Sequence, residues 1–355
     1  MANGGNWDAS ALPIRPGLYI NFESAALANI TGGARGIVGL PIFSYTGGTA
    51  ESGKFYTVES EVDANELVGS ANATPIKRAL EGGAKEVLIY AVPESETLDY
   101  DAIRDEFEAR EFNVFVYPTV VDAAEQTSTL AWVKRNREEG KHFMYVTGGS
   151  AADDQDVEVG NARSVLLKDE YIVNLVTGVV LADGTEVQSA DYASYIAGLI
   201  AGTPINKSIT YQQLPVADVT KRLKNSEIKS ALTSGSLVFV KDGNRVIIEQ
   251  GITTNSDQTE RGKIRKTRAR QAIATDIPRT ARERYIGKVD NNPAGQAALI
   301  SAIKLYLEAM ENNNVLTEPT VALDELRPPV GDSVFLKVGY TEVDSMERIF
   351  LTIAI

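Results

Sequence analysis

Residues 87–92 read VLIYAV, a continuous apolar run typical of a strand that is buried on both faces of a sheet. Three similar runs follow it, at 114–117, 142–146 (HFMYV) and 171–176 (YIVNLV). Segments with helical patterns separate or follow these runs, at 101–112, 123–139, 191–201 and in a helix that ends at 167. Strands that alternate with such helices predict a mostly parallel sheet with right-handed crossovers, so the predicted fold class is α/β.

The region before this alternation has the pattern of strands and turns. Residues 37–43 are apolar and β-prone, and residues 55–58 follow a glycine-rich turn. A short helix is expected at 74–80, where Gly82 and Gly83 would end it. We therefore place a β-rich domain at 23–95 and the α/β domain at 96–235, of which residues 216–235 look helical.

The region after residue 235 mixes strands and helices. Asp242-Gly243-Asn244 lies between two apolar segments and predicts a hairpin. Helices are expected at 264–274 and 294–310, and the second carries an apolar stripe at helical spacing, formed by Leu299, Ile303, Leu307 and Met310. These patterns predict an α+β C-terminal domain at 236–342.

Both ends of the chain are predicted to be extended arms, at 1–22 and 343–355. Pro13 and Pro16 favour extended backbone over helix, and residues 349–355 end the chain as an apolar strand. A strand this apolar is not expected to remain an open sheet edge. It either pairs within its own domain, which is the commoner solution, or adds to the sheet of a neighbouring chain.

The composition excludes several classes of function. The chain has 355 residues and no cysteine, which excludes disulfides, thiol catalysis and cysteine metal sites, and its single histidine, His142, excludes histidine clusters. Residues 1–10, MANGGNWDAS, lack the pattern of a signal peptide, and no apolar run reaches the ~18–20 residues of a membrane helix. A net charge of -13 argues against nucleic acid as a partner of the whole chain.

One segment departs from this acidic balance. Residues 261–288, which we call the basic island, carry ten basic residues against two acidic ones. Such a segment is a candidate docking surface for an acidic partner, or a basic helix paired with acidic neighbours in its own fold. No aromatic residues alternate with these charges in the pattern that binds single-stranded nucleic acid.

Motifs for cofactors are absent or incomplete. Residues 48–54 match the spacing of a phosphate-binding P-loop, but Phe55 stands where the magnesium-binding hydroxyl belongs, and a strand is expected to follow. No dinucleotide fingerprint or nucleophile elbow is present, and the acidic pairs lie in turn-like segments. We expect no cofactor, no metal and no catalytic residue.

Four segments resemble the family of contractile tail sheath proteins. RERYIGKVDNN at 282–292, followed by a helix and the asparagines 312–314, is similar to the C-terminal domain of that family, and VDSMERIFLTIAI at 343–355 is similar to its terminal strand. RPGLYINF at 15–22 and GIVGLP at 36–41 resemble its N-terminal segment. The likeness is closest to sheath proteins of myophage-type tails and of phage-tail-like bacteriocins from Gram-positive hosts.

The resemblance implies a structural subunit. Such subunits polymerise as hexameric rings around a tail tube and contract to drive the tube through a target cell envelope. The implied partners are further copies of the chain, the tail tube, the baseplate and the tail terminator, without nucleic acid or membrane. Assembly would take place in the host cytoplasm, and the product would be a tail or bacteriocin particle.

The resemblance also implies a subtilisin-like fold for the central sheet, without its catalytic site. His142 lacks the H-G-T context and no G-T-S-M-A serine motif exists, so we expect no enzyme activity. Two sets of residues are implied in assembly. The inter-subunit strand exchange would use Ile14, Leu18, Ile20, Ile349, Leu351, Ile353 and Ile355. The tube-facing basic patch would comprise Lys263, Arg265, Arg268, Arg270, Arg279 and Arg282.

Other readings of the residues remain open. The basic island could pair with acidic faces of neighbouring sheath subunits in place of a tube. The chain could also be an α/β enzyme or small-molecule binder with a pocket at the C-terminal ends of the central strands, near Val92, Pro118 and Thr147. A third possibility is another self-assembling shell protein that exchanges strands without a tube.

Overall fold

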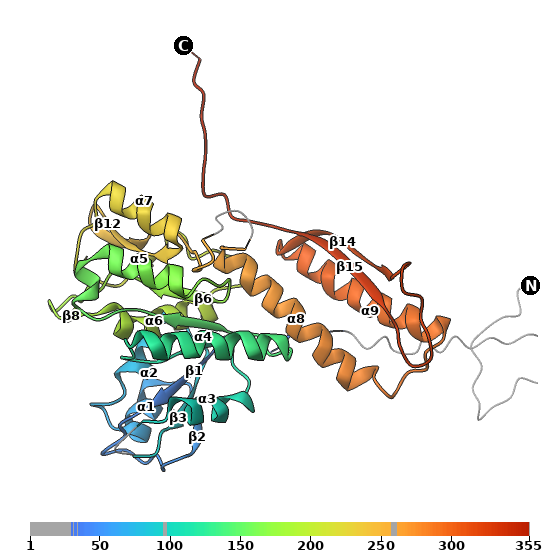
Figure 1. Ribbon diagram of the computed structural model, residues 1–355, viewed down its shortest axis with the longest axis horizontal. Helices are drawn as coiled ribbons and strands as arrows, with labels where there is room; N and C mark the ends of the chain where they lie inside the picture. Colours follow the sequence, from blue (N-terminus) through green and yellow to red (C-terminus); the bar gives the residue numbers. More distant parts are fainter. Residues whose placement is uncertain (1–29, 31, 34, 95–97, 257–260, 355) are drawn as a thin grey trace, which may run out of the picture.

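The core of the molecule is a mostly parallel sheet, seen in a computed structural model that describes residues 30, 32–33, 35–94, 98–256 and 261–354. Its seven strands lie in the order β11-β6-β5-β4-β1-β3-β2 (Figure 1). All neighbours pair in parallel except β2, which is antiparallel to β3. The strands are β1 Ile37–Ile42, β2 Phe55–Val58, β3 Glu86–Ala91, β4 Val114–Val116, β5 Met144–Thr147, β6 Ile172–Leu175 and β11 Ser236–Leu237. The predicted α/β class and the mostly parallel sheet are confirmed.

Helices cover both faces of this sheet. The chain passes from β1 toward one edge of the sheet to form β3, and then moves toward the other edge through β4, β5 and β6. Because each connection is right-handed, the helices of these two parts lie on opposite faces. On one face α2 and α6 touch closely, because a Cβ on Gly198 would lie 1.9 Å from the carbonyl oxygen of Ala79. The helices of this region are α1 Glu61–Val68, α2 Thr74–Gly82, α3 Tyr100–Glu108, α4 Ala123–Glu138, α5 Val157–Leu166 and α6 Ser189–Gly202, with a 3₁₀ turn, η1, at Asp153–Gln155.

The predicted separate β-rich domain at 23–95 does not form in the described part of that range. Strands β1 and β3 lie inside the central sheet, and α1 and α2 belong to the layer on one of its faces. All six residues of β1 are buried, because helices cover the sheet on both sides. The boundary placed at 95/96 therefore cuts through one continuous sheet.

The boundary placed at 235/236 also lies inside the body that surrounds the sheet. β11 extends the central sheet, and β12 Phe239–Asp242 and β13 Arg245–Ile248 form the predicted hairpin, which pairs with β9 Gln213–Leu214. Within 216–235, α7 is helical only over Asn225–Ser234, and β10 Asp218–Val219 pairs with β7 Val179–Val180, which is next to β8 Glu186–Val187. We call the described residues up to 254 the α/β body.

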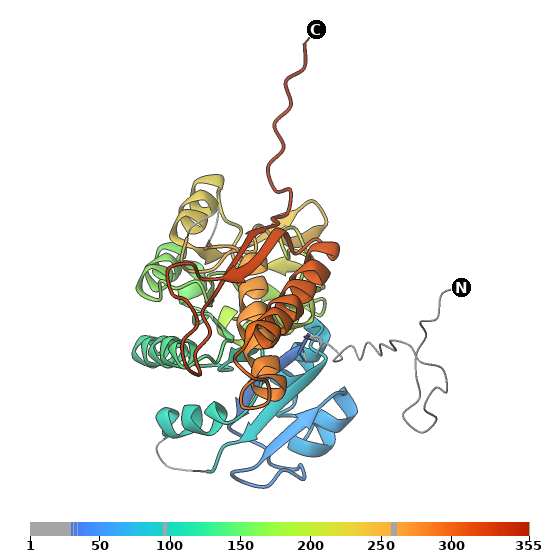
Figure 2. The same ribbon diagram turned by 90° about the vertical axis from the view of Figure 1, so that its right-hand side faces the viewer.

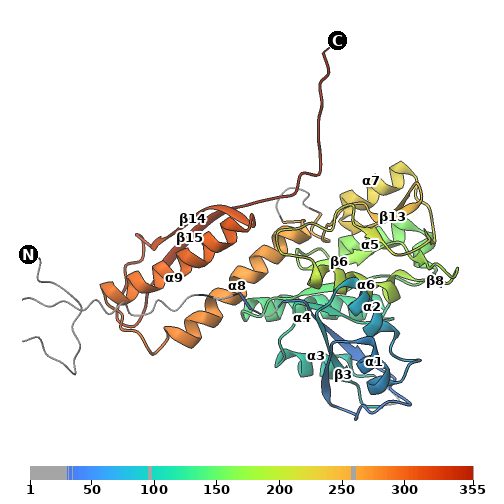
Figure 3. The same ribbon diagram turned by 180° about the vertical axis from the view of Figure 1, so that it is seen from behind.

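The C-terminal domain has its own hydrophobic core. Helix α8 Ile264–Arg284 leads out of the α/β body to α9 Pro293–Asn312 and to the hairpin of β14 Leu316–Leu323 and β15 Leu336–Glu342 (Figure 3). The predicted stripe on α9 is confirmed, since Ile303, Leu307 and Met310 are buried and Leu299 is partly buried in this core. α8 is longer than the predicted helix at 264–274 and continues through Pro278. A proline removes one hydrogen bond of the helix, and this loss costs least at an exposed position such as that of Pro278.

The described residues that follow β15 form no helix or strand. Residues 343–347 still contact the rest of the chain, and beyond Glu347 the trace runs away from both the α/β body and the C-terminal domain (Figure 2). We call residues 346–354 the C-terminal tail. Its predicted strand is therefore not paired within its own molecule over the residues that the structure describes.

Candidate functional site

The C-terminal tail presents an apolar surface to solvent. Ile349 is 68% exposed, Leu351 82% and Ile353 80%, and between them Phe350 is 90% exposed. Apolar side chains gathered in this way are typical of a segment that another chain covers. Ile355 and the N-terminal residues Ile14, Leu18 and Ile20 of the predicted strand exchange lie outside the described residues.

The basic island does not form one open surface. Lys263, Arg265 and Arg268 are less than a tenth exposed. Arg268 donates to the carbonyl oxygens that end α6, at 2.5 Å from that of Thr203, and burial lowers its pKa to about 10. Arg265 donates to the carbonyl oxygen of Asn314 at 3.0 Å, and Lys263 pairs with Glu347. These three residues lie at the start of α8, and their side chains bond partners within the same chain, so the tube-facing role of the patch stays a prediction.

The remaining residues of the predicted patch, Arg270, Arg279 and Arg282, are half-buried or exposed on α8. The guanidinium of Arg270 bonds both carboxylate oxygens of Glu342, at 2.6 and 2.7 Å, and bonds Glu170 at 3.0 Å. Arg279 pairs with Asp276 at 3.4 Å, whereas the side chain of Arg282 is exposed. The acidic partners of Arg270 come from segments far from α8 in the sequence, whereas Asp276 lies on α8 itself, three positions before Arg279.

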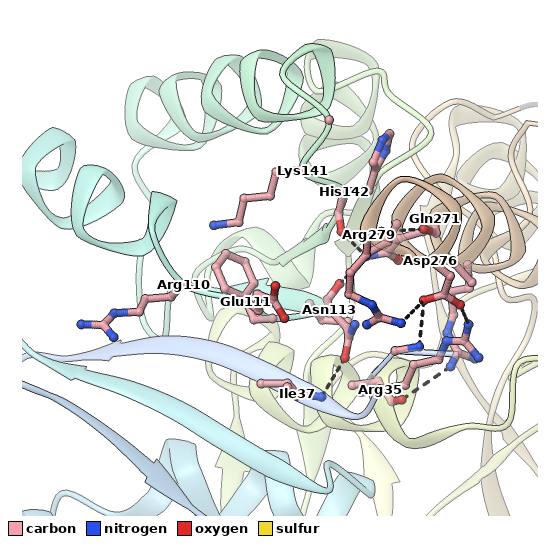
Figure 4. A pocket seen from close by; sticks show the side chains of 18 of the residues that line it. Arg35, Ile37, Arg110, Glu111, Asn113, Lys141, His142, Gln271, Asp276 and Arg279 are labelled. Atoms are coloured by element: carbon pink, nitrogen blue, oxygen red, sulfur yellow. Dashed lines mark hydrogen bonds and ion pairs between the residues drawn. The ribbon is translucent and has the colours of Figure 1, made fainter. Parts of the chain in front are cut away.

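A cavity of about 340 Å³ lies between α8 and the N-terminal ends of the parallel strands (Figure 4). Its lining is strongly charged, with basic and acidic side chains from α8, from the turn before β4 and from the turn before β5. Lys141 lies there with its ammonium bonded to the carbonyl oxygens of Phe107 and Glu108, and burial lowers its pKa to about 8. The side chains that carry these charges are Arg35, Glu108, Arg110, Glu111, Glu139, Lys141, Arg268, Asp276, Arg279 and Arg282.

The opposite, C-terminal edge of the sheet is where α/β enzymes bind their ligands, at the point where the strand order reverses. Here that point lies between β1 and β4, and aromatic rings occupy it. The ring of Tyr100 packs at 6.2 Å from Phe43 and 5.5 Å from Tyr117, whose hydroxyl donates to the Tyr100 carbonyl oxygen. Nearby, the buried Gln126 amide donates to the Thr147 hydroxyl. The alternative function, an enzyme or small-molecule binder, requires a pocket near Val92, Pro118 and Thr147. The cavity described above lies at the other end of the strands.

His142 has a structural environment. Its Nδ1 lies 3.1 Å from the Tyr171 hydroxyl, and burial and the charge of Arg137 lower its pKa. The P-loop-like residues 48–54 lead into strand β2, as predicted, and Lys54 pairs with Glu51 at 2.6 Å. Among the described residues no group of three metal-ligating side chains gathers, and no helix has the length and apolar character needed to cross a membrane.

Comparisons with known proteins place this architecture among tail sheath proteins. The model of the phage tail sheath protein central domain matches residues 94–254, and that of the phage tail sheath C-terminal domain matches 256–355. A tail sheath protein of Clostridium phage phiCD119 is 27% identical over 232 residues, which are 62% of this chain and 60% of the relative. One of Staphylococcus phage Twort is 21% identical over 58% of this chain and 36% of the relative. The chain thus matches about 60% or less of the length of these two relatives.

Solved structures share the fold over most of the chain. A sheath tail protein from Desulfitobacterium hafniense superposes with a TM-score of 0.70 at 21% identity, over 92% of this chain and 100% of the other. The helical sheath of the anti-feeding prophage in its contracted state gives a TM-score of 0.74 at 16% identity, over 97% and 99%. Because the two sheath models account for most of the sequence and sheath structures share its fold, the chain belongs to the phage tail sheath protein family.

Proposed function

We propose that this chain is the structural subunit of a contractile tail sheath, which polymerises around a tail tube and contracts to drive the tube through a target cell envelope. One observation supports this above the others. A chain of the sheath family carries an apolar C-terminal tail that leaves its own domains and is open to a neighbouring copy. Burying a side chain such as Ile, Leu or Phe contributes about 1.5–3 kcal/mol.

Strand exchange would connect the subunits. Ile349, Leu351, Ile353 and Ile355 at one end of the chain, and Ile14, Leu18 and Ile20 at the other, would each join a sheet of a neighbour. The hairpin of β14 and β15 would be the sheet that accepts such a strand, because among the described residues each of its two strands pairs only with the other. Association costs about 4–15 kcal/mol, which is of the same order as the gain from burying the apolar side chains of one tail.

Contraction would need no nucleotide. The extended sheath would be metastable and would store free energy as contacts between subunits that form only on contraction, with release beginning at the baseplate. Exchanged strands would hold the lattice together through backbone hydrogen bonds while the subunits rotate. The baseplate and the tail terminator would bind the two ends of the sheath, which would assemble in the host cytoplasm and end in the finished particle.

The tube contact would involve the exposed part of the basic island. Arg282 and Arg284 are exposed near the end of α8, whereas the residues at its start are buried. Exposed ion pairs contribute about 0–1 kcal/mol each, so a tube contact of this kind would be weak in one subunit and strong only when repeated along a sheath. Acidic faces of neighbouring subunits are the other candidate partner for these side chains.

The subunit would not be an enzyme, and any likeness to subtilisin would concern the course of the central strands. A serine protease aligns its histidine with a carboxylate and a serine, and here the histidine ring contacts a tyrosine hydroxyl. The purified protein is therefore expected to release no peptides from a protein substrate, as measured by mass spectrometry. Hydrolysis that His142→Ala abolishes would overturn this part of the proposal.

Negative-stain electron microscopy of the purified full-length chain tests the function directly. We expect hollow, striated cylinders at high protein concentration, since exchanged strands link each copy to the next. Discrete particles that never polymerise under any condition would contradict the sheath proposal, and flat sheets would indicate another kind of shell protein.

A further inference from the structure

Two buried carboxylates lie close to the first and the last described segments of the chain. Asp276 on α8 lies next to the first described residues of the N-terminal region, and Glu347 lies at the start of the C-terminal tail. The Asp276 side chain is 2% exposed and that of Glu347 is 9% exposed. Burying an ionised carboxylate is costly unless several donors bond it. The partners of these two carboxylates therefore show what each one holds in place.

Asp276 holds the segment that precedes β1. Its Oδ1 accepts a hydrogen bond from the backbone N–H of Gly33 at 2.8 Å, and its Oδ2 accepts one from the Arg35 guanidinium at 2.6 Å (Figure 4). Tyr306 on α9 donates its hydroxyl to Oδ2 at 2.7 Å. The backbone approaches closely, since a Cβ on residue 33 would lie 2.3 Å from an Arg279 nitrogen. The carboxylate thus joins the N-terminal segment to two helices of the C-terminal domain.

Glu347 holds the segment that follows β15. Its Oε1 accepts a hydrogen bond from the Thr210 hydroxyl at 2.8 Å, and its Oε2 accepts one from the Gln250 amide at 2.8 Å and pairs with Lys263. Lys263 is itself 4% exposed, so the pair is shielded from solvent. Ser345 and Ser208 also donate to Oε1, at 3.0 and 3.5 Å, and of these five partners only Ser345 is a near neighbour in the sequence. Glu347 thus joins the half-buried residues that precede the tail to distant segments of the chain, and the described residues that follow it are exposed.

The exposed fractions of the residues around Glu347 show that the polar bonds of Glu347, and not apolar packing, hold this segment in place. Met346 on one side is 83% exposed and Ile349 beyond it is 68% exposed, so the apolar residues of the tail contribute little to holding it. In a stretch held by a hydrophobic core the apolar side chains would be the buried ones. The side chain buried here is the charged one, and its bonds fix where the tail begins and the direction in which it leaves.

We propose that Asp276 and Glu347 are positioning residues, which fix the points from which the two ends of the chain extend to neighbouring subunits. This inference rests on the proposed sheath function, because only an assembly uses those ends. It assigns to each carboxylate a role that stability of the isolated subunit does not require. A chain end that is already held at one point loses less conformational entropy when it binds a neighbouring subunit than an unrestrained end does.

Spin-label distance measurements on the 355-residue chain, before it is assembled, test the anchor at Glu347. The sequence has no cysteine, so the double variant Met346→Cys with Val165→Cys can be labelled at those two sites alone, and Val165 is 62% exposed on α5. We expect one narrow distance peak, which Glu347→Gln turns into a broad distribution. The matched control is Asp344→Asn, whose carboxylate is farther from its partner, at 3.9 Å from Lys266, and which should keep the narrow peak. An unchanged peak in Glu347→Gln would overturn the anchor.

The same design tests Asp276. A label at Gly32→Cys, paired with Val165→Cys, should give a narrow peak that Asp276→Asn broadens. If Asp276→Asn fails to fold, Arg35→Gln removes one donor that belongs to the N-terminal segment alone, and it should broaden the peak as well. A narrow peak in Arg35→Gln, with the fold intact, would contradict the role of Asp276.

An assembly experiment then tests whether sheath formation depends on the fixed starting point of the C-terminal tail. With the anchor of Glu347→Gln loosened, we expect the yield of cylinders in electron micrographs to fall by roughly tenfold or more, the effect of losing a hydrogen bond to a charged group. Normal cylinders from a variant with a broad distance distribution would overturn the inference. If the unmodified protein itself forms no cylinders, the sheath proposal has failed, and the distance measurements still show whether the carboxylates hold the chain ends.

Discussion

A chain that ends at Arg348 is expected to fold like the full-length protein and to form no cylinders at all. The deletion removes Ile349, Phe350, Leu351 and Ile353, whose side chains make almost no contact with the rest of the molecule, because each is at least two-thirds exposed. Loss of exposed residues changes stability little, within about 0.5 kcal/mol. The proposed exchange, in contrast, loses every backbone and side-chain contact of that strand. Thermal unfolding and negative-stain microscopy measure the two effects separately.

A substitution in the same strand provides the matched control. Thr352 lies within the deleted segment, and Thr352→Ala keeps the backbone and all the apolar side chains of the strand. We expect this variant to assemble. If the truncated chain assembles as well as Thr352→Ala does, the C-terminal tail does not link subunits.

The second large effect is expected for Arg268→Glu, which should cost at least about 3–5 kcal/mol of unfolding free energy. The arginine is buried and donates to the carbonyl oxygens at the C-terminal end of α6, where the helix dipole favours a positive charge. A glutamate there would place a buried negative charge against those oxygens and leave them without donors. Urea unfolding, followed by tryptophan fluorescence, measures the loss.

Arg282→Glu is the control for this charge reversal. It makes the same change on the same helix, but at an exposed position, and is expected to shift the unfolding free energy by no more than about 0.5 kcal/mol. Equal stabilities of the two variants would contradict the burial of Arg268. In assembled particles, Arg282→Glu also tests the tube contact, because sheaths that still form on tubes at the normal yield would remove this residue from the proposed patch.

The recognisable parts of the fold come from local patterns. Apolar runs predicted β3, β5 and β6, because strands covered on both faces carry apolar side chains at most positions. The stripe on α9 predicted which of its side chains are buried, and Asp242-Gly243-Asn244 predicted the hairpin of β12 and β13. The same local information missed that β1 lies in the central sheet between β3 and β4, because sequence spacing does not show which strands are neighbours.

The amino-acid sequence by itself determined the α/β class, the apolar character of the final strand, the absence of cysteine chemistry and the resemblance to sheath proteins. Only the tertiary structure showed which partners within the chain the basic residues at and near the start of α8 bond. Their partners, among them Glu342, Glu347 and the end of α6, lie some 60 to 85 positions away along the chain. The spacing of apolar residues, which predicts the buried face of a helix or strand, can be seen within one short segment of sequence. The ion-pair partner of a charged residue depends instead on which distant segments folding brings within a few ångströms of it.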